Sequence, residues 1–125
     1  MANKLKAVVI GCGRIGSEFD NDPKRLYVST HAGAYAAVKD TELVAVCDID
    51  ENKAKKSADR WGIKHVFIDF DKMMRECAPD IVSICTPPST HYSVLRKLVK
   101  YKPKAVFCEK PIASCIKEAE KMIEL

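Results

Sequence analysis

The sequence predicts an α/β domain whose central sheet is parallel and carries helices on both faces. Five short apolar stretches recur along the chain, and the segments between them are long enough for helices. Strands that alternate with helices form parallel sheets with right-handed crossovers, which gives three layers, α/β/α. The chain has 125 residues. Because this length suits one core, we expect residues 1–125 to form a single domain.

The expected strands are the apolar stretches, because they are short and bounded by turn-forming residues. They are Leu5–Ile10, Leu43–Cys47, His65–Ile68, Ile81–Cys85 and Ala105–Cys108. The expected helices fill the intervals and the carboxyl end. They are Ala32–Val38, Asn52–Trp61, Phe70–Cys77, Thr90–Val99 and Ser114–Leu125. Gly62, Pro79 and Pro103 are placed to end three of these helices before the next strand.

Composition narrows the class of protein. Hydrophobic residues make up 47% of the chain and charged residues 30%, which is a globular balance. The net charge of +4 comes from basic residues interleaved with acidic ones, as in residues 50–56, so we expect solvated helix faces and no nucleic-acid partner. No apolar run approaches the roughly 18 residues that span a bilayer. We therefore expect a soluble, cytoplasmic protein without membrane contact.

Six cysteines are present, and none of them forms a C-x-x-C pair. Three lie inside expected strands, where a reduced thiol acts as a small core side chain. The cysteines therefore predict neither a metal site nor a redox centre.

The first expected strand runs directly into a glycine-rich turn with the spacing G-x-G-x-x-G, at residues 11–16. In a dinucleotide-binding turn, Gly11 takes the tight bend, Gly13 lets the backbone approach a pyrophosphate, and Gly16 lets the next helix pack closely. A helix that begins there would point its free backbone N–H groups, including those of Arg14 and Ile15, at the phosphates. The turn therefore predicts a doubly wound, Rossmann-type sheet with a dinucleotide site, although similar turns also serve as plain connections.

Asp48 follows the second expected strand, where its carboxylate can accept hydrogen bonds from the adenosine ribose. The alternative is a helix N-cap, a role also open to Asp50. Both carboxylates would repel a 2′-phosphate and no arginine follows the strand, so NAD is favoured over NADP. Lysines at 53, 55 and 56 lie close enough in sequence to weaken that preference.

Asp48 lies much further from the glycines than the roughly 20 residues of the compact dinucleotide fingerprint. A polar, proline-bearing stretch at residues 17–30 interrupts the first crossover before the helical pattern resumes. This insertion is either a lid or contact surface near the substrate, or a plain surface loop.

Polar residues also follow the last two expected strands. Thr86 and Pro87 begin a rigid turn that can lie beside an uncharged ring system, and a serine or threonine at 89–90 can cap the following helix. His91 in that helix either bonds the cofactor or is structural. Glu109 and Lys110 follow the fifth strand, where Lys110 can donate a hydrogen bond or a proton to a substrate oxygen. The alternative is that Glu109 and Lys110 are a solvated charged pair at the end of a strand.

The last expected helix has no strand after it, whereas a doubly wound dinucleotide fold usually has about six strands. We therefore expect either a cofactor domain of a larger protein or a chain that completes its sheet edge through a partner.

These motifs in this order resemble the amino-terminal domain of the Gfo/Idh/MocA oxidoreductases, the family of glucose-fructose oxidoreductase and inositol dehydrogenase. The resemblance rests on the glycine turn, Asp48, the Thr86-Pro87 segment with His91, and the Glu109-Lys110-Pro111 segment, and it covers essentially the whole chain. It implies a Rossmann domain that binds NAD(P). In the family, a second domain supplies the substrate pocket and usually the oligomer interface.

The resemblance also implies an activity and roles for residues. Members commonly transfer a hydride between the nicotinamide and a hydroxyl of a sugar, inositol or related polyol. The lysine that matches Lys110 lies near nicotinamide and substrate, so Lys110 is the expected catalytic residue. The glutamate that matches Glu109 lines the same site, and the Thr-Pro segment runs along the cofactor.

We expect this chain to lack the second domain, and therefore to bind NAD but to be inactive alone. The full-length protein would be a homo-oligomeric dehydrogenase acting on a sugar or polyol. The alternative is a regulatory domain that senses NAD(H) without catalysis. A scaffold with a degenerate site is disfavoured, because all the strand-end residues are present.

Overall fold

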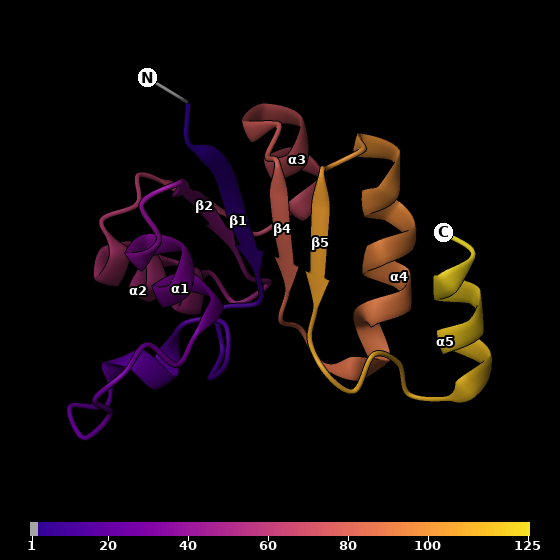
Figure 1. Cartoon of the computed structure of the whole chain (residues 1–125), viewed down its shortest axis with the longest axis horizontal. Coiled ribbons are helices and arrows are strands. Elements are labelled where there is room, and N and C mark those ends of the chain that lie inside the picture. The colour runs from indigo at the N-terminus through magenta and orange to yellow at the C-terminus, as the bar shows by residue number, and fades with distance from the viewer. Residues whose placement is uncertain (1–2) are drawn as a thin grey trace.

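The computed structural model describes residues 3–125, which form one parallel sheet with helices on both faces (Figure 1). The strands are β1 (Leu5–Ile10), β2 (Thr41–Cys47), β3 (His65–Phe67), β4 (Ile81–Ile84) and β5 (Ala105–Cys108). Their order is β3-β2-β1-β4-β5, and every neighbouring pair is parallel. All carboxyl ends therefore lie along one edge, as the predicted doubly wound sheet requires.

The helices connect the strands and cover the sheet. They are α1 (His31–Ala37), α2 (Glu51–Trp61), α3 (Phe70–Cys77), α4 (Pro88–Leu98) and α5 (Ile116–Ile123), with short 3-10 helices η1 (Glu18–Asn21) and η2 (Val99–Tyr101). The two ends of α2 have clear causes. The side chain of Asp50 accepts hydrogen bonds from the first-turn N–H groups, and Gly62 ends the helix in the left-handed conformation.

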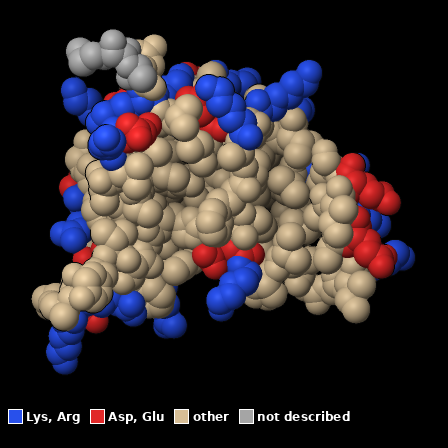
Figure 2. Space-filling model, in the orientation of Figure 1, with Lys and Arg blue, Asp and Glu red and all other residues tan. Residues whose placement is uncertain are grey.

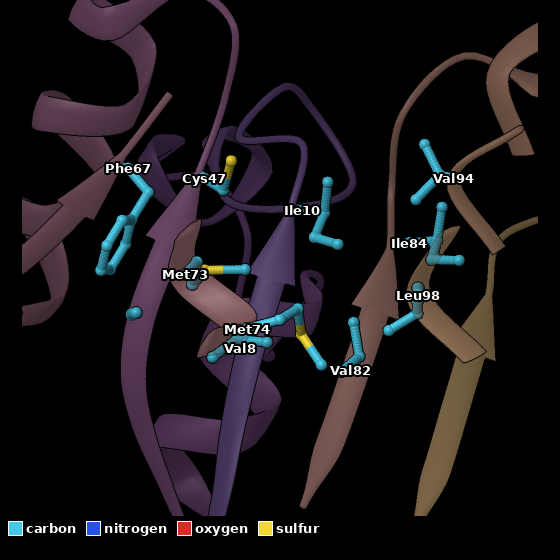
Figure 3. Close-up of a cluster of buried hydrophobic side chains, with 11 residues drawn as sticks. Val8, Ile10, Cys47, Phe67, Met73, Met74, Val82, Ile84, Val94 and Leu98 are labelled. Atoms are coloured by element: carbon cyan, nitrogen blue, oxygen red, sulfur yellow. The ribbon is translucent and has the colours of Figure 1, made fainter. Parts of the chain in front are cut away.

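Two clusters of buried side chains hold these layers together. Successive residues of β1 point to opposite faces, so Val8 and Ile10 enter one cluster and Val9 enters the other. The first cluster includes Met73 from α3 and Leu98 from α4 (Figure 3). The second packs alanines of α1 and α2 against β1 and β2. Helices therefore bury both faces of the central strands, which explains why β1 reads as a continuous apolar run.

The face of β4 and β5 on the side of α1 is less covered than the rest of the sheet. In Figure 1 both strands are visible without a helix in front of them, and Figure 2 shows few charged side chains over this area. Phe107 on β5 is 58% exposed. The charged side chains in this view gather around the rim of the molecule instead.

The predicted elements are present, and their ends differ in instructive places. β2 begins at Thr41 because Leu5 of β1 pairs with that residue. α4 begins at Pro88, two residues before the predicted start, because proline fits the first turn of a helix. Ser89 and Thr90 therefore lie inside the first turn, and the prediction that one of them caps the helix is wrong.

The prediction that a helix begins at the glycine turn needs correction. Residues 14–17 form a single turn, which passes into η1, and the first α-helix begins only at His31. The N–H of His31 nevertheless donates to the carbonyl of Ile15, and the N–H of Ala32 donates to Gly16, at 3.1 and 2.9 Å. The turn and α1 thus continue one another across the predicted insertion.

The insertion is fastened at its base. The carboxylate of Asp20 accepts hydrogen bonds from the N–H of Ser29, at 2.8 Å, and from the hydroxyl of Thr30. The guanidinium of Arg60 on α2 donates to the carbonyl of Asp20 at 2.9 Å. Beyond this base the loop is exposed. Among residues 3–125 no helix is long and apolar enough to cross a membrane.

Candidate functional site

A cleft of about 550 Å³ opens at the carboxyl edge of the sheet, between the ends of β1, β2 and β4. The strand order reverses between β1 and β4, and ligands of open α/β sheets bind outside the strands at such a point. Five predicted site residues line the cleft: Gly11, Gly13, Asp48, Thr86 and Pro87. The cleft therefore joins three motifs that are far apart in the sequence.

The three glycines of the turn lie in different surroundings. Gly11 has a φ of +98°, and a Cβ there would lie 2.6 Å from the backbone of Cys85. A Cβ on Gly16 would overlap the carbonyl oxygen of Gly11. A Cβ on Gly13 would meet no protein atom within 4 Å. Gly11 and Gly16 are thus required by the fold, whereas Gly13 leaves open space beside the cleft, where a ligand can approach the backbone.

The turn also presents hydrogen-bond donors. The N–H groups of Gly13, Arg14, Ile15 and Gly16 have no acceptor among residues 3–125. The N–H of Ser17 is the first that is satisfied within the turn, by the carbonyl of Gly13 at 3.0 Å. Unpaired N–H groups at the start of a helical turn form an anion-binding arrangement. Arg14 and Ile15 offer these backbone groups without lining the cleft itself.

Asp48 is held in place by two backbone donors. Its Oδ2 accepts from the N–H of Cys12 and its Oδ1 from the N–H of Asp50, both at 2.8 Å. Asp50 itself is the N-cap of α2, so the capping alternative for Asp48 does not apply. Each carboxylate oxygen has a second lone pair that can accept from a ligand hydroxyl.

The back of the glycine turn is fixed by buried contacts. The hydroxyl of Ser57 on α2 donates to Ser17 Oγ at 2.8 Å, and the indole N–H of Trp61 donates to the same oxygen at 3.1 Å. Cys12 is 1% exposed, and burial raises the pKa of its thiol to about 12. The Cys12 side chain therefore stays neutral and packs inside the domain as a small core residue.

The segment after β4 lies along the cleft and is supported from behind. The hydroxyl oxygens of Thr86 and Thr90 lie 2.6 Å apart, within hydrogen-bond distance. His91 is fully buried, with Nε2 2.7 Å from the carbonyl of Thr86 and Nδ1 3.1 Å from the carbonyl of Ile112. Each ring nitrogen therefore faces a backbone carbonyl. His91 thus contacts two loops from behind the cleft and does not line it.

Glu109 and Lys110 follow β5 at the same edge of the sheet, outside the lining of the cleft. The Nε2 of His31 lies 2.7 Å from Oε1 of Glu109, and this hydrogen bond holds the pKa of Glu109 below its usual value. The N–H of Lys110 lies 3.2 Å from Oε2 of the same carboxylate, and the Lys110 side chain is exposed. Figure 2 shows acidic and basic side chains meeting below the ends of β4 and β5.

Several residues of the cleft were not predicted as site residues. Ile49, Ile68 and Phe70 line the cleft without having been singled out in the sequence. Lys53 and Thr90, which the sequence suggested for other roles, line it as well. Ile49 and Ile68 are large apolar side chains with exposed fractions of 94% and 58%. Ile49 comes two residues after the end of β2, and Ile68 directly follows the end of β3. A position just after a strand is therefore the feature of the sequence that could have identified both residues. Of the three lysines near Asp48, only Lys53 lines the cleft, while Lys55 pairs with Glu51 at 3.0 Å.

Comparison with known proteins gives a consistent picture. Residues 5–125 match the Gfo/Idh/MocA family model, described as an oxidoreductase family with an NAD-binding Rossmann fold. The chain is 31% identical over 124 residues to D-glucoside 3-dehydrogenase of Escherichia coli, covering 98% of this chain and 32% of the relative. It is 28% identical over 120 residues to myo-inositol 2-dehydrogenase of Thermotoga maritima, and this match covers 96% of this chain and 32% of the relative.

A solved structure extends the likeness to three dimensions. An oxidoreductase of Agrobacterium radiobacter, crystallised with NAD+, L-tartaric acid and magnesium, superimposes with a TM-score of 0.79 at 26% identity. The match covers 98% of this chain and 32% of that protein. The chain thus spans about a third of the length of the relatives it matches.

Proposed function

The chain belongs to the Gfo/Idh/MocA oxidoreductase family and forms an NAD-binding Rossmann domain, and from this premise we propose how its residues hold the dinucleotide. Asp48 accepts hydrogen bonds from the adenosine ribose. The N–H groups of Gly13, Arg14, Ile15 and Gly16 face the pyrophosphate. The observation that carries the proposal is the convergence of the fixed Asp48 carboxylate and the open backbone at Gly13 in one cleft.

The apolar lining of the cleft supports the placement of the adenosine end. Ile49 and Ile68 line the cleft together with Asp48 and expose apolar surface, and Pro87 lines it from the segment after β4. A planar base gains by covering such surface, because apolar area leaves water. The nicotinamide end then extends past the glycine turn toward β4 and β5, where Thr86, Glu109 and Lys110 follow their strands.

The nucleotide preference follows from charge. Asp48 and Asp50 line the cleft where a 2′-phosphate would lie, and both disfavour that dianion. Lys53 is the opposing charge in the same lining. We propose NAD as the preferred cofactor, because two carboxylates face one ammonium group and the fixed carboxylate of Asp48 also matches two free ribose hydroxyls.

The bound nicotinamide would supply the hydride chemistry, and the protein would supply the positioned groups around it. Lys110 is the proposed catalytic residue of this domain. Its ammonium group can hydrogen-bond a substrate oxygen, and in its neutral form it can take a proton from a hydroxyl. Glu109 holds the backbone of Lys110 through Oε2.

We extend the proposal to the longer protein as a dehydrogenase or reductase that acts on a hydroxyl of a sugar, inositol or related polyol. Its remaining catalytic groups and its substrate pocket would come from a second domain, as would a homo-oligomer interface. The chain alone would bind the cofactor without turnover.

Calorimetric titration of the chain with NADH and, in parallel, NADPH tests the cofactor proposal. We expect both to bind, with NADH preferred. In the variant Gly13→Asp the added carboxylate opposes the pyrophosphate, so NADH binding is lost. Gly13→Asn is the matched control of equal size, and it should retain more affinity than the charged variant. Unchanged NADH affinity in Gly13→Asp would contradict the placement of the pyrophosphate.

A further inference from the structure

Four polar side chains form a continuous hydrogen-bonded chain between α1, β4 and the segment after β5. The hydroxyl of Tyr35 lies 2.6 Å from Ser83 Oγ, which lies 2.8 Å from Nδ1 of His31. The other ring nitrogen of His31 lies 2.7 Å from Oε1 of Glu109. Ser83 is fully buried, and the side chains of His31 and Glu109 are only 10% and 18% exposed. This polar chain ends beside Lys110.

With a neutral imidazole at His31, the donors and acceptors of the polar chain allow one set of hydrogen positions. An ionised Glu109 only accepts, so Nε2 of His31 carries the hydrogen of that bond. The neutral imidazole then accepts at Nδ1 from the hydroxyl of Ser83. Ser83 in turn accepts from the hydroxyl of Tyr35. Every bond has one hydrogen and one lone pair, so the buried polar groups are all satisfied.

Packing of α1 against the sheet does not by itself require this polar chain. The ring of His31 meets the ring of Phe107 edge to face, with centroids 4.8 Å apart, and apolar residues could fill the same space. Burying an imidazole and a hydroxyl is unfavourable unless each polar atom is paired. The polar chain therefore indicates a requirement at its end, which is the Glu109 carboxylate.

We propose that His31 is a positioning residue for Glu109. By holding Oε1, His31 fixes the carboxylate so that Oε2 keeps the backbone of Lys110 in place after β5, beside the proposed position of the nicotinamide. Ser83 and Tyr35 fix the imidazole through Nδ1. This inference rests on the proposed function, because it requires the nicotinamide to lie near the ends of β4 and β5 when Asp48 holds the adenosine ribose.

The test compares two ligands that share the adenosine and the pyrophosphate. NADH carries the nicotinamide, whereas ADP-ribose lacks it. In His31→Leu we expect the NADH affinity, measured by calorimetry, to fall by roughly three- to tenfold, which is the size of one charge-assisted hydrogen bond lost in part. The affinity for ADP-ribose should stay within twofold. His31→Gln, which retains an N–H donor, should recover part of the NADH affinity.

Two further measurements distinguish a specific loss of NADH affinity from a general loss of structure in the His31 variants. His65→Leu changes an exposed histidine on β3 and should leave both affinities unchanged. Nitrogen NMR of the imidazoles in the unaltered chain reports the tautomer without any substitution at His31. There we expect hydrogen on Nε2 of His31, and Glu109→Gln should shift this signal and leave that of His65 in place.

The outcomes separate the two proposals. If the unaltered chain binds neither ligand, the proposed function is wrong and the inference fails with it. If it binds both, and His31→Leu weakens both equally or weakens neither, the cofactor site stands and the positioning role of His31 is wrong. Hydrogen on Nδ1 in place of Nε2 would also overturn the role. Selective loss of NADH affinity with partial recovery in His31→Gln supports it.

Discussion

The carboxylate of Asp48 and the backbone N–H of Cys12, 36 residues apart in the sequence, are joined by a hydrogen bond of 2.8 Å. The acid after β2 is thereby attached to the glycine turn after β1. A second bond, from the N–H of Asp50, holds the other carboxylate oxygen. The two motifs that the sequence analysis treated separately are thus one rigid unit, and its acceptor oxygens are in place before a ligand arrives.

This attachment gives the first prediction. Asp48→Asn replaces one acceptor oxygen by a donor group, so the ribose loses an acceptor and the N–H of Cys12 or Asp50 loses its partner. We expect a roughly ten- to hundredfold loss of NADH affinity, a smaller loss for NADPH, and a destabilisation of about 1–3 kcal/mol. Calorimetry and chemical denaturation measure the two effects.

The N-cap of α3 offers a matched control for that variant. Asp69 also accepts a backbone N–H, that of Asp71, but does not line the cleft. Asp69→Ala should therefore destabilise the domain by about 1 kcal/mol and leave NADH affinity unchanged. Equal losses of affinity in the two variants would mean that Asp48 acts only through stability.

The second prediction separates the glycines of the turn. A methyl group at Gly11 or Gly16 would collide with backbone atoms, and Gly11 also has a left-handed φ. We expect Gly11→Ala and Gly16→Ala each to lower the free energy of unfolding by at least about 1–3 kcal/mol. Gly13→Ala should leave it nearly unchanged, because open space receives the methyl group. Thermal unfolding monitored by circular dichroism gives the comparison, and a large loss in Gly13→Ala would refute it.

The third prediction concerns thiol reactivity. Burial raises the pKa of Cys12 and of Cys47 to about 12, so both remain protonated and shielded at neutral pH. Cys115 is exposed before α5. A disulfide reagent such as DTNB should modify Cys115 rapidly in the native domain and the buried pair only on unfolding. Cys115→Ser should remove the fast phase, and a fast phase that persists at Cys12 would show that the turn opens.

The fourth prediction is a dependence of stability on pH. The hydrogen bond from His31 lowers the pKa of Glu109 in the folded state below the usual 4.5. A group with a lowered folded pKa stabilises fully above its ordinary pKa and loses that contribution as the pH falls through the folded value. The stability difference between the unaltered chain and Glu109→Gln should therefore be largest near pH 6 and shrink toward pH 3. Denaturation curves at several pH values test this, and a constant difference would contradict it.

The sheet and the glycine turn were predictable because they rest on local patterns. β1 and β5 match their predicted bounds, and α3 does so at both ends. In each of these elements, the apolar residues or the capping residue that define its ends are neighbours in the sequence. The predicted start of α4 is two residues late, because Pro88 can belong to a turn as readily as to the first turn of a helix.

The buried polar contacts could not be predicted in the same way. Ser83 lies in an apolar run, and nothing beside it in the sequence names His31 or Tyr35 as its partners. The sequence does not indicate that the ring nitrogens of His91 lie next to the carbonyls of Thr86 and Ile112. Such pairs depend on how strands and helices meet across the fold, which local pattern does not encode.

Two backbone hydrogen bonds join α1 directly to the glycine turn across residues 18–30, which makes this loop suitable for engineering. Because the carbonyls of Ile15 and Gly16 already receive the N–H groups of His31 and Ala32, the main-chain path of the helix is closed without the loop. Between the fastened residues Asp20 and Ser29, segments of other lengths can be grafted while the cleft keeps its shape. A library of such grafts would place new surface next to the glycine turn without redesigning the domain that carries it.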